Sequence, residues 1–383
     1  MKPRVLHITP SFLPAFGGME NCVLNVALRH AAEWDVHILA NYRAQAMHGA
    51  AYDVHHFLPF TFPLLDNHPR LGGLFVALQL LAMQRRHRFD LWHAHFTDHF
   101  GQIQVEAAMR CRVPCLWAVH EFSCVRNLKA YFDRRRHVTD RLPPNRLIVE
   151  VGAGHLAEQI AALSRVRCVH VPRGCNHDLF RDTPPSPDGR RYGFNLIAMA
   201  RNIPDKRLAL SIRLVDHLVK AGHTDVGLTI ITHDTRSLAA LVDQFGLRER
   251  VRLLRSADLQ RGARFVIPPL GAIAELKAAD CLVSMHRYEA SPNVLIEAFA
   301  AGLPVLVCDT AEYRQLVTDG QNGFIAKSDD PKDLAEPVLK LMRDAELRRR
   351  MADNAEQAGR AFDWEKSARR YAELYREALA SRV

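Results

Sequence analysis

The sequence has no apolar run approaching the roughly 20 residues that a membrane-spanning helix needs, and no signal-peptide pattern opens it. Both absences favour a cytoplasmic protein. Eight cysteines are scattered over 383 residues without a CxxC pair, which is unlike a secreted disulfide framework. Cys111, Cys115, His120 and Cys124 are close enough in sequence to consider a zinc site. We prefer ordinary burial, because Cys111 is expected to end a helix and Cys115 to lie in a strand.

Aromatic residues are also scarce, at 8% of the chain. Single-strand nucleic-acid binders interleave aromatic and basic residues, so this scarcity argues against that class. The formal charge is +9, which nevertheless calls for an anionic partner. Nucleotide phosphates and an acidic membrane surface both satisfy it, and we expect no nucleic acid.

Length and hydropathy pattern predict the fold class. A chain of 383 residues with 48% hydrophobic content is expected to form two domains rather than one. Short apolar runs alternate with helix-length segments, which is typical of parallel sheets covered by helices. The expected strands cover 5–9, 36–40, 91–94, 115–119, 147–151 and 168–171, and then 195–199, 227–231, 251–254, 281–284 and 304–308.

We therefore predict an α/β protein with two Rossmann-like, doubly wound parallel-sheet domains facing across a cleft. The domains cover residues 1–175 and 176–362, and residues 363–383 form a C-terminal helix that crosses back to the first domain. The polar, proline-rich stretch 181–191 is the expected linker. Ligands of such folds bind at the carboxyl ends of the strands, so the loops there hold the candidate site residues.

In the first domain, Gly17 and Gly18 follow the first strand and open a helix. Such a loop either contacts an anion or is a plain tight turn. His120 directly follows the strand 115–119 and should project from its tip. We rank it above His93 and His95, which end another strand, although an isolated histidine is more often structural.

In the second domain, Arg201 and Lys206 follow the strand 195–199 and form a plausible clamp for a diphosphate. Solvated surface cations are the alternative. The segment 284–305 is expected to form strand, loop, helix, glycine turn and strand, with Glu289 in the loop. Glu297 lies two turns into an otherwise apolar helix, where a carboxylate needs a partner such as a ribose diol. A solvated helix face is again the alternative.

These motifs together resemble the retaining glycosyltransferases of the GT-B fold, glycosyltransferase family 4. Glu289 and Glu297 meet the family pattern of two glutamates separated by seven residues, and Glu-Ala-x-Ala-x-Gly-x-Pro-Val follows at 297–305. The resemblance departs from the family at Arg207, where glycine is usual, and at 285–286, where Pro-Ser is usual. Further matches are Gly17 to Glu20, Asp90 with His93 and His95, 171–174, 178–180, Arg201 with Lys206, 319–320 and 323–324.

The resemblance implies a retaining, metal-independent transferase that moves a hexose-type sugar from a nucleotide-diphosphate sugar to an acceptor hydroxyl. It implies front-face displacement assisted by the leaving diphosphate, with UDP favoured by family frequency, and no cofactor beyond this co-substrate. The first domain would hold the acceptor and the second the donor. The implied roles are diphosphate binding by Arg201 and Lys206, ribose binding by Glu297, donor-sugar contacts by Glu289 and His120, closure over the phosphates by Gly17 and Gly18, and lining of the donor by the backbone of Ala290, Ser291, Pro292, Asn293 and Val294.

Other functions remain open at this point. A GT-B phosphorylase or a nucleotide-sugar epimerase shares the architecture, and a basic membrane-surface or nucleic-acid-binding protein shares the charge. The acceptor is a small molecule, a glycan or a lipid-linked molecule. The apolar stretches 57–65 and 71–83 precede the basic run 85–88, which would suit peripheral docking at the inner face of an anionic membrane. We prefer a core-packing helix with a solvated basic end.

Overall fold

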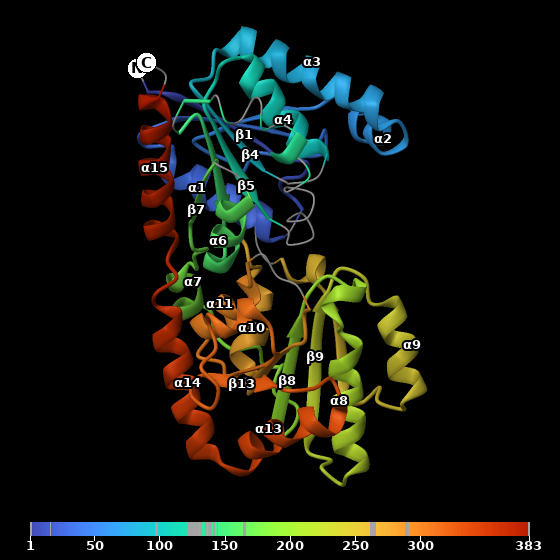
Figure 1. Cartoon of the computed structure of the whole chain (residues 1–383). Helices are drawn as coiled ribbons and strands as arrows, with labels where there is room; N and C mark the ends of the chain where they lie inside the picture. The colour runs from blue at the N-terminus through green and yellow to red at the C-terminus, as the bar shows by residue number, and fades with distance from the viewer. Residues whose placement is uncertain are drawn as a thin grey trace. The chain divides into compact units, whose positions relative to one another are not determined.

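The computed structural model describes residues 2–15, 17–95, 99–120, 130, 132–134, 136, 140, 142–143, 145–163, 166–260, 266–287 and 291–381. The chain forms two compact units (Figure 1). Unit 1 consists of Met1–Arg173 with Trp364–Val383, and unit 2 consists of Gly174–Asp363. The boundaries expected from the sequence differ from these by one or two residues. In the described part of the chain, no helix is both long and apolar enough to cross a membrane.

Unit 1 contains a seven-stranded parallel sheet in the order β3-β2-β1-β4-β5-β6-β7. Its strands are β1 (Arg4–Ile8), β2 (Asp35–Ala40), β3 (Asp53–His56), β4 (Leu91–His95), β5 (Cys115–Val119), β6 (Leu147–Val151) and β7 (Arg167–His170). Its helices are α1 (Gly18–His30), α2 (Thr61–Asn67), α3 (Pro69–His87), α4 (His99–Arg110), α6 (Gly154–Leu163) and α15 (Trp364–Ala380).

The central strands of unit 1 form because most of their residues are apolar, with His93, His95 and Glu150 as polar exceptions in β4 and β6. Every residue of β4, β5 and β6 is buried, as parallel strands covered on both faces require. The edge strand β3 was not predicted, since its sequence Asp-Val-His-His is polar and its residues are half-buried or exposed. Sheet pairing with β2, rather than local hydrophobicity, defines this strand.

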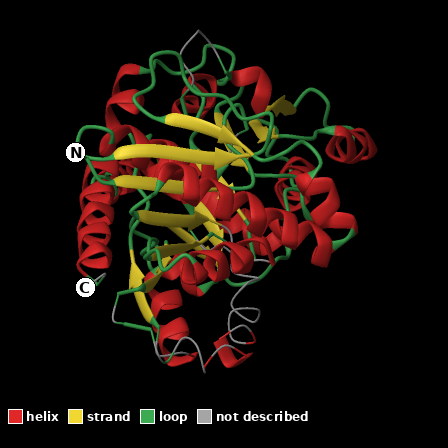
Figure 2. Ribbon diagram, turned by 90° about the horizontal axis from the view of Figure 1, so that it is seen from above, coloured by secondary structure: helices red, strands yellow, loops and turns green. Residues whose placement is uncertain are grey.

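Unit 2 contains a six-stranded parallel sheet in the order β10-β9-β8-β11-β12-β13. Figure 2 shows strands flanked by helices. Its strands are β8 (Phe194–Met199), β9 (Val226–Thr232), β10 (Val251–Arg255), β11 (Cys281–Ser284), β12 (Val305–Cys308) and β13 (Gly323–Ala326). Its helices are α7 (His177–Asp182), η1 (Pro204–Lys206), α8 (Ala209–Lys220), α9 (Arg236–Gln244), η2 (Ser256–Leu259), α10 (Leu270–Ala278), α11 (Asn293–Ala300), α12 (Ala311–Arg314), α13 (Pro331–Arg343) and α14 (Ala345–Gly359). The prediction of two parallel-sheet α/β domains is confirmed.

The predicted glycine turn between α11 and β12 is centred on Gly302. This residue has φ +66°, a backbone conformation that favours glycine. The N–H of Leu303 donates to the carbonyl of Ala298 at 2.9 Å, which satisfies one of the last carbonyls of the helix. Gly302 thus ends α11 and redirects the chain into β12.

The prediction that the proline-rich stretch 181–191 is a linker is wrong. The stretch is held on α10 within unit 2: Ser186 N–H donates to Ala274 O at 2.8 Å, and Ser186 Oγ donates to Glu275 at 2.7 Å. Lys277 Nζ donates to the carbonyls of Phe180 at 2.7 Å and Thr183 at 2.5 Å. The prolines interrupt regular structure, while side chains of α10 supply the hydrogen bonds that the stretch cannot make itself. The sequence boundary between the units lies instead at Arg173 and Gly174.

The C-terminal helix α15 completes the core of unit 1. Arg173 is 1% exposed and pairs with the fully buried Glu150 at 3.0 Å, and it also donates to the hydroxyl of Tyr371 on α15. The hydroxyl of Tyr375 lies 2.6 Å from His93 Nδ1. In agreement with the prediction, the last helix therefore packs in the first domain, where it supplies polar as well as apolar contacts.

Candidate active site

The glycine loop lies at the carboxyl end of β1, where Gly18 begins α1. Gly17 is extended, and a side chain there would come within 2.5 Å of Glu20 Oε2. Glu20 is 7% exposed and accepts a hydrogen bond from Ser11 Oγ. The absence of a side chain at Gly17 thus makes room for the Glu20 carboxylate in the first turn of α1.

His120 follows β5 and is the end of a chain of hydrogen-bonded imidazoles. His95 Nδ1 lies 2.9 Å from His120 Nε2, and His95 Nε2 lies 3.1 Å from His7 Nδ1. Burial holds the pKa of His95 and His120 well below the usual imidazole value, and the charge of Arg173 adds to this effect at His120. His120 is therefore a neutral, half-buried imidazole whose orientation is set by His95.

His93 does not join the candidate site, because its ring points to Tyr375 on α15. The rings of His93 and His95 are both fully buried, whereas His120 is half-buried, and its role toward a substrate stays a prediction. Two members of the considered zinc group are far apart, because Cys115 begins β5 and His120 follows its end, about 16 Å farther along the strand. Cys124 lies outside the described residues.

In unit 2, Arg201 and Lys206 follow the carboxyl end of β8. Arg201 is exposed, and Lys206 is half-buried at the end of η1. The N–H of Arg287 donates to Asp205 O at 3.1 Å, so the η1 turn is fastened to the loop that leads to α11. Arg207, which replaces the usual glycine of the resembled family, has φ +52° and ψ +35°. Arg207 thus has a left-handed backbone conformation, which glycine adopts without steric cost, and this explains why glycine is usual at this position in the resembled family.

Helix α11 carries the buried carboxylate. Glu297 is 8% exposed, and burial raises its pKa from 4.5 to about 8. Across the described residues, no side chain donates a hydrogen bond to this carboxylate. Asn293 and Val294 form the first turn of α11 and are half-buried. A largely buried carboxylate that accepts from no described side chain can accept from the hydroxyl groups of a ligand, so Glu297 fits a hydroxyl-bearing ligand.

The loop before α11 is described only from Ser291. Ser291 is half-buried and Pro292 is buried next to the first turn, and no side-chain cap is seen on this helix start within the described residues. Glu289 and Ala290 lie outside the described residues. Their predicted roles stay predictions.

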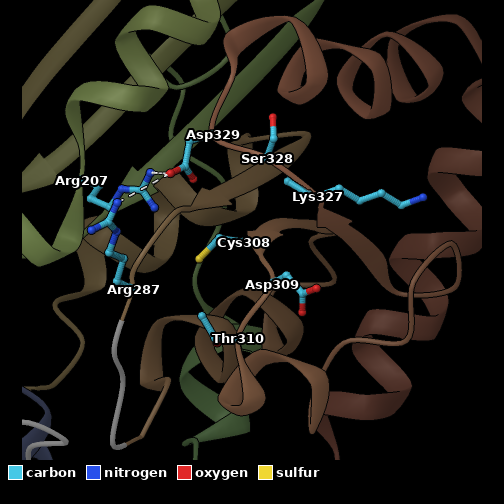
Figure 3. A pocket seen from close by; sticks show the side chains of 9 residues that line it. Arg207, Arg287, Cys308, Asp309, Thr310, Lys327, Ser328 and Asp329 are labelled. Atoms are coloured by element: carbon cyan, nitrogen blue, oxygen red, sulfur yellow. Dashed lines mark ion pairs between the residues drawn. The ribbon is translucent and has the colours of Figure 1, made fainter.

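A pocket of about 300 Å³ lies at the same edge of the unit 2 sheet. Figure 3 shows Arg207 and Arg287 pointing toward Asp329, and both form ion pairs with it, Arg287 at 4.0 Å. Cys308 Sγ donates to His286 O at 2.8 Å beside them. The residues that line this pocket are Arg207, Arg287, Cys308, Asp309, Thr310, Ala326, Lys327, Ser328 and Asp329. Three of these are cations against two carboxylates, so the pocket favours an anion.

Sequence reasoning assigned no role to Arg287 or Asp329. The available signal was positional, because Arg287 comes three residues after β11 and Asp329 three residues after β13. Carboxyl ends of neighbouring parallel strands meet at one edge, so charged residues there converge. Since β13 was not predicted, this convergence could not be deduced.

Comparison with known proteins identifies the class. The fold matches sucrose-phosphate synthase from Thermosynechococcus elongatus with a TM-score of 0.77, 17% identity and coverage of 99% of this chain and 100% of that chain. It also matches Anabaena HepE in complex with UDP and glucose, with a TM-score of 0.72, 19% identity and coverage of 96% and 98%. D-inositol 3-phosphate glycosyltransferase of Nocardioides sp. is 27% identical over 98% of this chain and 89% of that protein.

The chain is therefore a glycosyltransferase of the GT-B fold. Its residues 192–358 match the family described as glycosyl transferases group 1. The matched region contains β8 to α14, and so includes Arg201, Lys206 and Glu297.

Proposed function

We propose that this glycosyltransferase is a retaining, metal-independent enzyme of family 4 that transfers a hexose-type sugar from a UDP-sugar to an acceptor hydroxyl. The observation that carries the proposal is Glu297, a buried carboxylate with an elevated pKa and no hydrogen-bond donor among the described side chains. A ribose diol supplies two O–H donors and would satisfy it. Donor recognition by this residue does not depend on the base.

The cations at the carboxyl edge of unit 2 would stabilise the leaving group. As the bond between the anomeric carbon and the diphosphate breaks, negative charge grows on the diphosphate. Arg201 and Lys206 both follow β8, and the 3.1 Å hydrogen bond from Arg287 to Asp205 holds this turn against the loop before α11. These two cations would take the role that a divalent metal has in other nucleotide-dependent enzymes.

The transfer step is balanced within the donor and acceptor. A new bond joins the acceptor oxygen to the anomeric carbon on the face from which the diphosphate leaves. The acceptor proton passes to an oxygen of the departing diphosphate, giving a glycoside and UDP. His120, neutral and oriented by His95, would contact the donor sugar without adding positive charge near the reacting carbon.

UDP is favoured over other nucleotides because HepE was crystallised with UDP and glucose. A thermal-shift screen of UDP, GDP, ADP and TDP sugars tests this choice, since a tight ligand raises the apparent stability. Inositol phosphates are the first acceptors to test, as a relative is named for one. Stabilisation by another nucleotide but not by UDP would contradict the donor assignment.

The diphosphate role is tested with Lys206→Ala. Loss of one group that stabilises transition-state charge is expected to lower kcat by about 10²–10³-fold. Lys220→Ala is the matched control, because Lys220 is exposed on α8, where it pairs with Asp216 at 2.8 Å and lies over the ring of Phe245. Equal turnover of the two variants would refute the assignment.

The stereochemistry and metal independence need separate measurements. NMR of the freshly formed glycoside should show the anomeric configuration of the donor, and turnover should persist after treatment with EDTA. Inversion or complete loss with EDTA would contradict the respective part of the proposal. Phosphate-dependent cleavage of a glycoside, or epimerisation without acceptor, would instead indicate the phosphorylase or epimerase alternative.

We also propose that α3 and the segment before α2 dock on an anionic membrane to reach a lipid-linked acceptor. The expected core packing of α3 holds for Val76 and Leu80, which are buried, but is wrong for Leu71, Leu74 and Leu78, which are 48%, 55% and 51% exposed. These leucines lie at helical spacing on one face. Leu58 and Phe60 add exposed apolar surface, and Arg85 and Arg86 lie in the last turn of α3.

Co-sedimentation with vesicles containing phosphatidylglycerol tests this docking. Wild-type protein should bind at low salt and release at high salt, and the double variant Leu74→Ser with Leu78→Ser should lose most of the binding. Leu28→Ser is a control, since Leu28 is 40% exposed on α1. No binding of the wild type at low salt would refute the proposal.

A further inference from the structure

A group of three histidines gathers near the amino edge of the unit 1 sheet, opposite the edge that holds His120. His37 lies on β2, His55 on β3, and His87 is the last residue of α3. One ring nitrogen from each lies within 4.8 Å of the others. Asp53, the first residue of β3, lies beside this group and has a carboxylate oxygen near His37.

Two distances from His37 are close to those between the ligands of one metal ion. His37 Nδ1 lies 3.0 Å from His55 Nε2 and 3.6 Å from Asp53 Oδ2. Four ligands at about 2.0–2.1 Å from a tetrahedral zinc ion are separated from one another by about 3.3 Å. We propose that His37, His55, His87 and Asp53 bind a zinc ion that links β2, β3 and the end of α3.

A carboxylate lies close to the second ring nitrogen of His37, where zinc-binding histidines usually have one, although no hydrogen bond joins the two in this structure. Asp35 Oδ1 lies 3.3 Å from His37 Nε2, on the side of the ring away from Asp53. Asp35 is itself held by Arg4, whose Nε lies 3.1 Å from Asp35 Oδ2. A carboxylate on the second ring nitrogen orients the imidazole and increases its basicity as a ligand.

The residues around the proposed zinc site pack against His87 on one side and leave the site open to solvent on the other. Phe89 is buried and stacks on His87, with ring centres 5.4 Å apart and planes at 13°. His55 and His87 are half-buried, and the Asp53 side chain is 71% exposed, so an ion can enter from solvent. The positive charges of Arg4 and Arg86 oppose cation binding, while the carboxylates of Asp35 and Asp53 favour it.

A second histidine group, His7 with His93 and His95, is a weaker candidate. All three are fully buried, and ring nitrogens of His93 and His95 already contact Tyr375 and His120. A divalent ion there would have to enter the closed core. This group is nevertheless the natural competitor in an experiment.

The zinc site would be structural. Three protein elements and four protein ligands would surround the ion, which is typical of zinc sites that stabilise a fold. The weakly specified edge strand β3 would thereby be fixed to β2 and α3. The proposed sugar transfer does not use this ion.

The test starts from full-length protein treated with a chelator and then titrated with ZnCl₂ by isothermal calorimetry, with Co²⁺ as a spectroscopic probe. We expect one tight zinc per chain, a raised Tm, and the visible absorption of tetrahedral Co²⁺. His55→Gln should abolish this binding, and Asp35→Asn should weaken it by about 10–100-fold. His48→Gln is the control, because His48 is exposed on a loop.

Folding of each variant is checked by circular dichroism without metal, and His87→Gln replaces His55→Gln if the latter does not fold. Unchanged zinc affinity in both variants would overturn the proposal. So would loss of the zinc in His93→Gln with retention in His55→Gln, since the ion would then lie in the buried group. Absence of tight zinc binding to the wild type would also overturn it.

Discussion

Glu297→Gln should change the pH dependence of unit 2 stability. The pKa of Glu297 is about 8 in the folded protein against 4.5 as the ordinary value, and burial is the cause. Between these values the folded state binds a proton that the unfolded state has released. Stability conferred by the neutral, protonated side chain is therefore fully present below pH 4.5 and is lost as the pH rises toward 8.

The magnitude follows from the width of this window. Each pH unit inside it lowers the free energy of unfolding by about 1.4 kcal/mol. From pH 5 to pH 8 the wild type should lose about 4 kcal/mol through this group, and the glutamine variant should not. The variant should consequently gain about 4 kcal/mol relative to the wild type over the same range.

The two units can be observed separately. All four tryptophans, Trp34, Trp92, Trp117 and Trp364, lie in unit 1, so their fluorescence follows that unit alone. Native-state hydrogen exchange of α11 follows unit 2. The pH-dependent difference should occur in α11 exchange and not in the fluorescence transition. Parallel pH profiles of wild type and variant in α11 would refute the reasoning, because Glu297 would then titrate normally.

Three further substitutions test the packing. Arg173→Met should destabilise unit 1 by about 3–5 kcal/mol in tryptophan-monitored unfolding, because it leaves Glu150 as a buried unpaired acid. Adding Glu150→Gln should restore part of this loss, and equal stability of the single variant and the wild type would contradict the prediction. Lys277→Met should cost unit 2 about 1.5–3 kcal/mol and speed proteolysis near Thr183, whereas unchanged cleavage would show that the stretch is held otherwise. Gly302→Ala should cost about 1 kcal/mol in α11 exchange, and a neutral effect would contradict the role of its positive φ.

The parallel sheets could be predicted from the sequence because most of their strands are short apolar runs, which are recognisable without knowledge of their neighbours. The bounds 115–119, 147–151 and 281–284 agree with β5, β6 and β11, whose residues are all buried. The polar β3 and the four-residue β13 lack such a signal, since their pairing partners define them. The same limit explains the false linker: Lys277 and Glu275 are distant in sequence from the prolines that they hold.

The candidate site was predictable in its types of residue more than in its contacts. Glu297 stood out because a carboxylate interrupted an apolar helix, and its burial agrees with that argument. The contact of His120 with His95 required knowledge that β4 and β5 are neighbours. Arg287 and Asp329 approach each other only because their strands end at one edge, and a linear pattern does not contain that proximity.

The position of α15 imposes an order on synthesis and folding. Unit 2 is one continuous stretch of chain, so a ribosome delivers all of its strands before residues 364–380 appear. Unit 1 must wait for those last residues, because Tyr371 and Tyr375 contact Arg173 and His93 in its core. Unit 1, most of which is synthesised first, therefore completes its core after unit 2. A premature stop within α15 would remove core residues from unit 1 and leave the sequence of unit 2 intact.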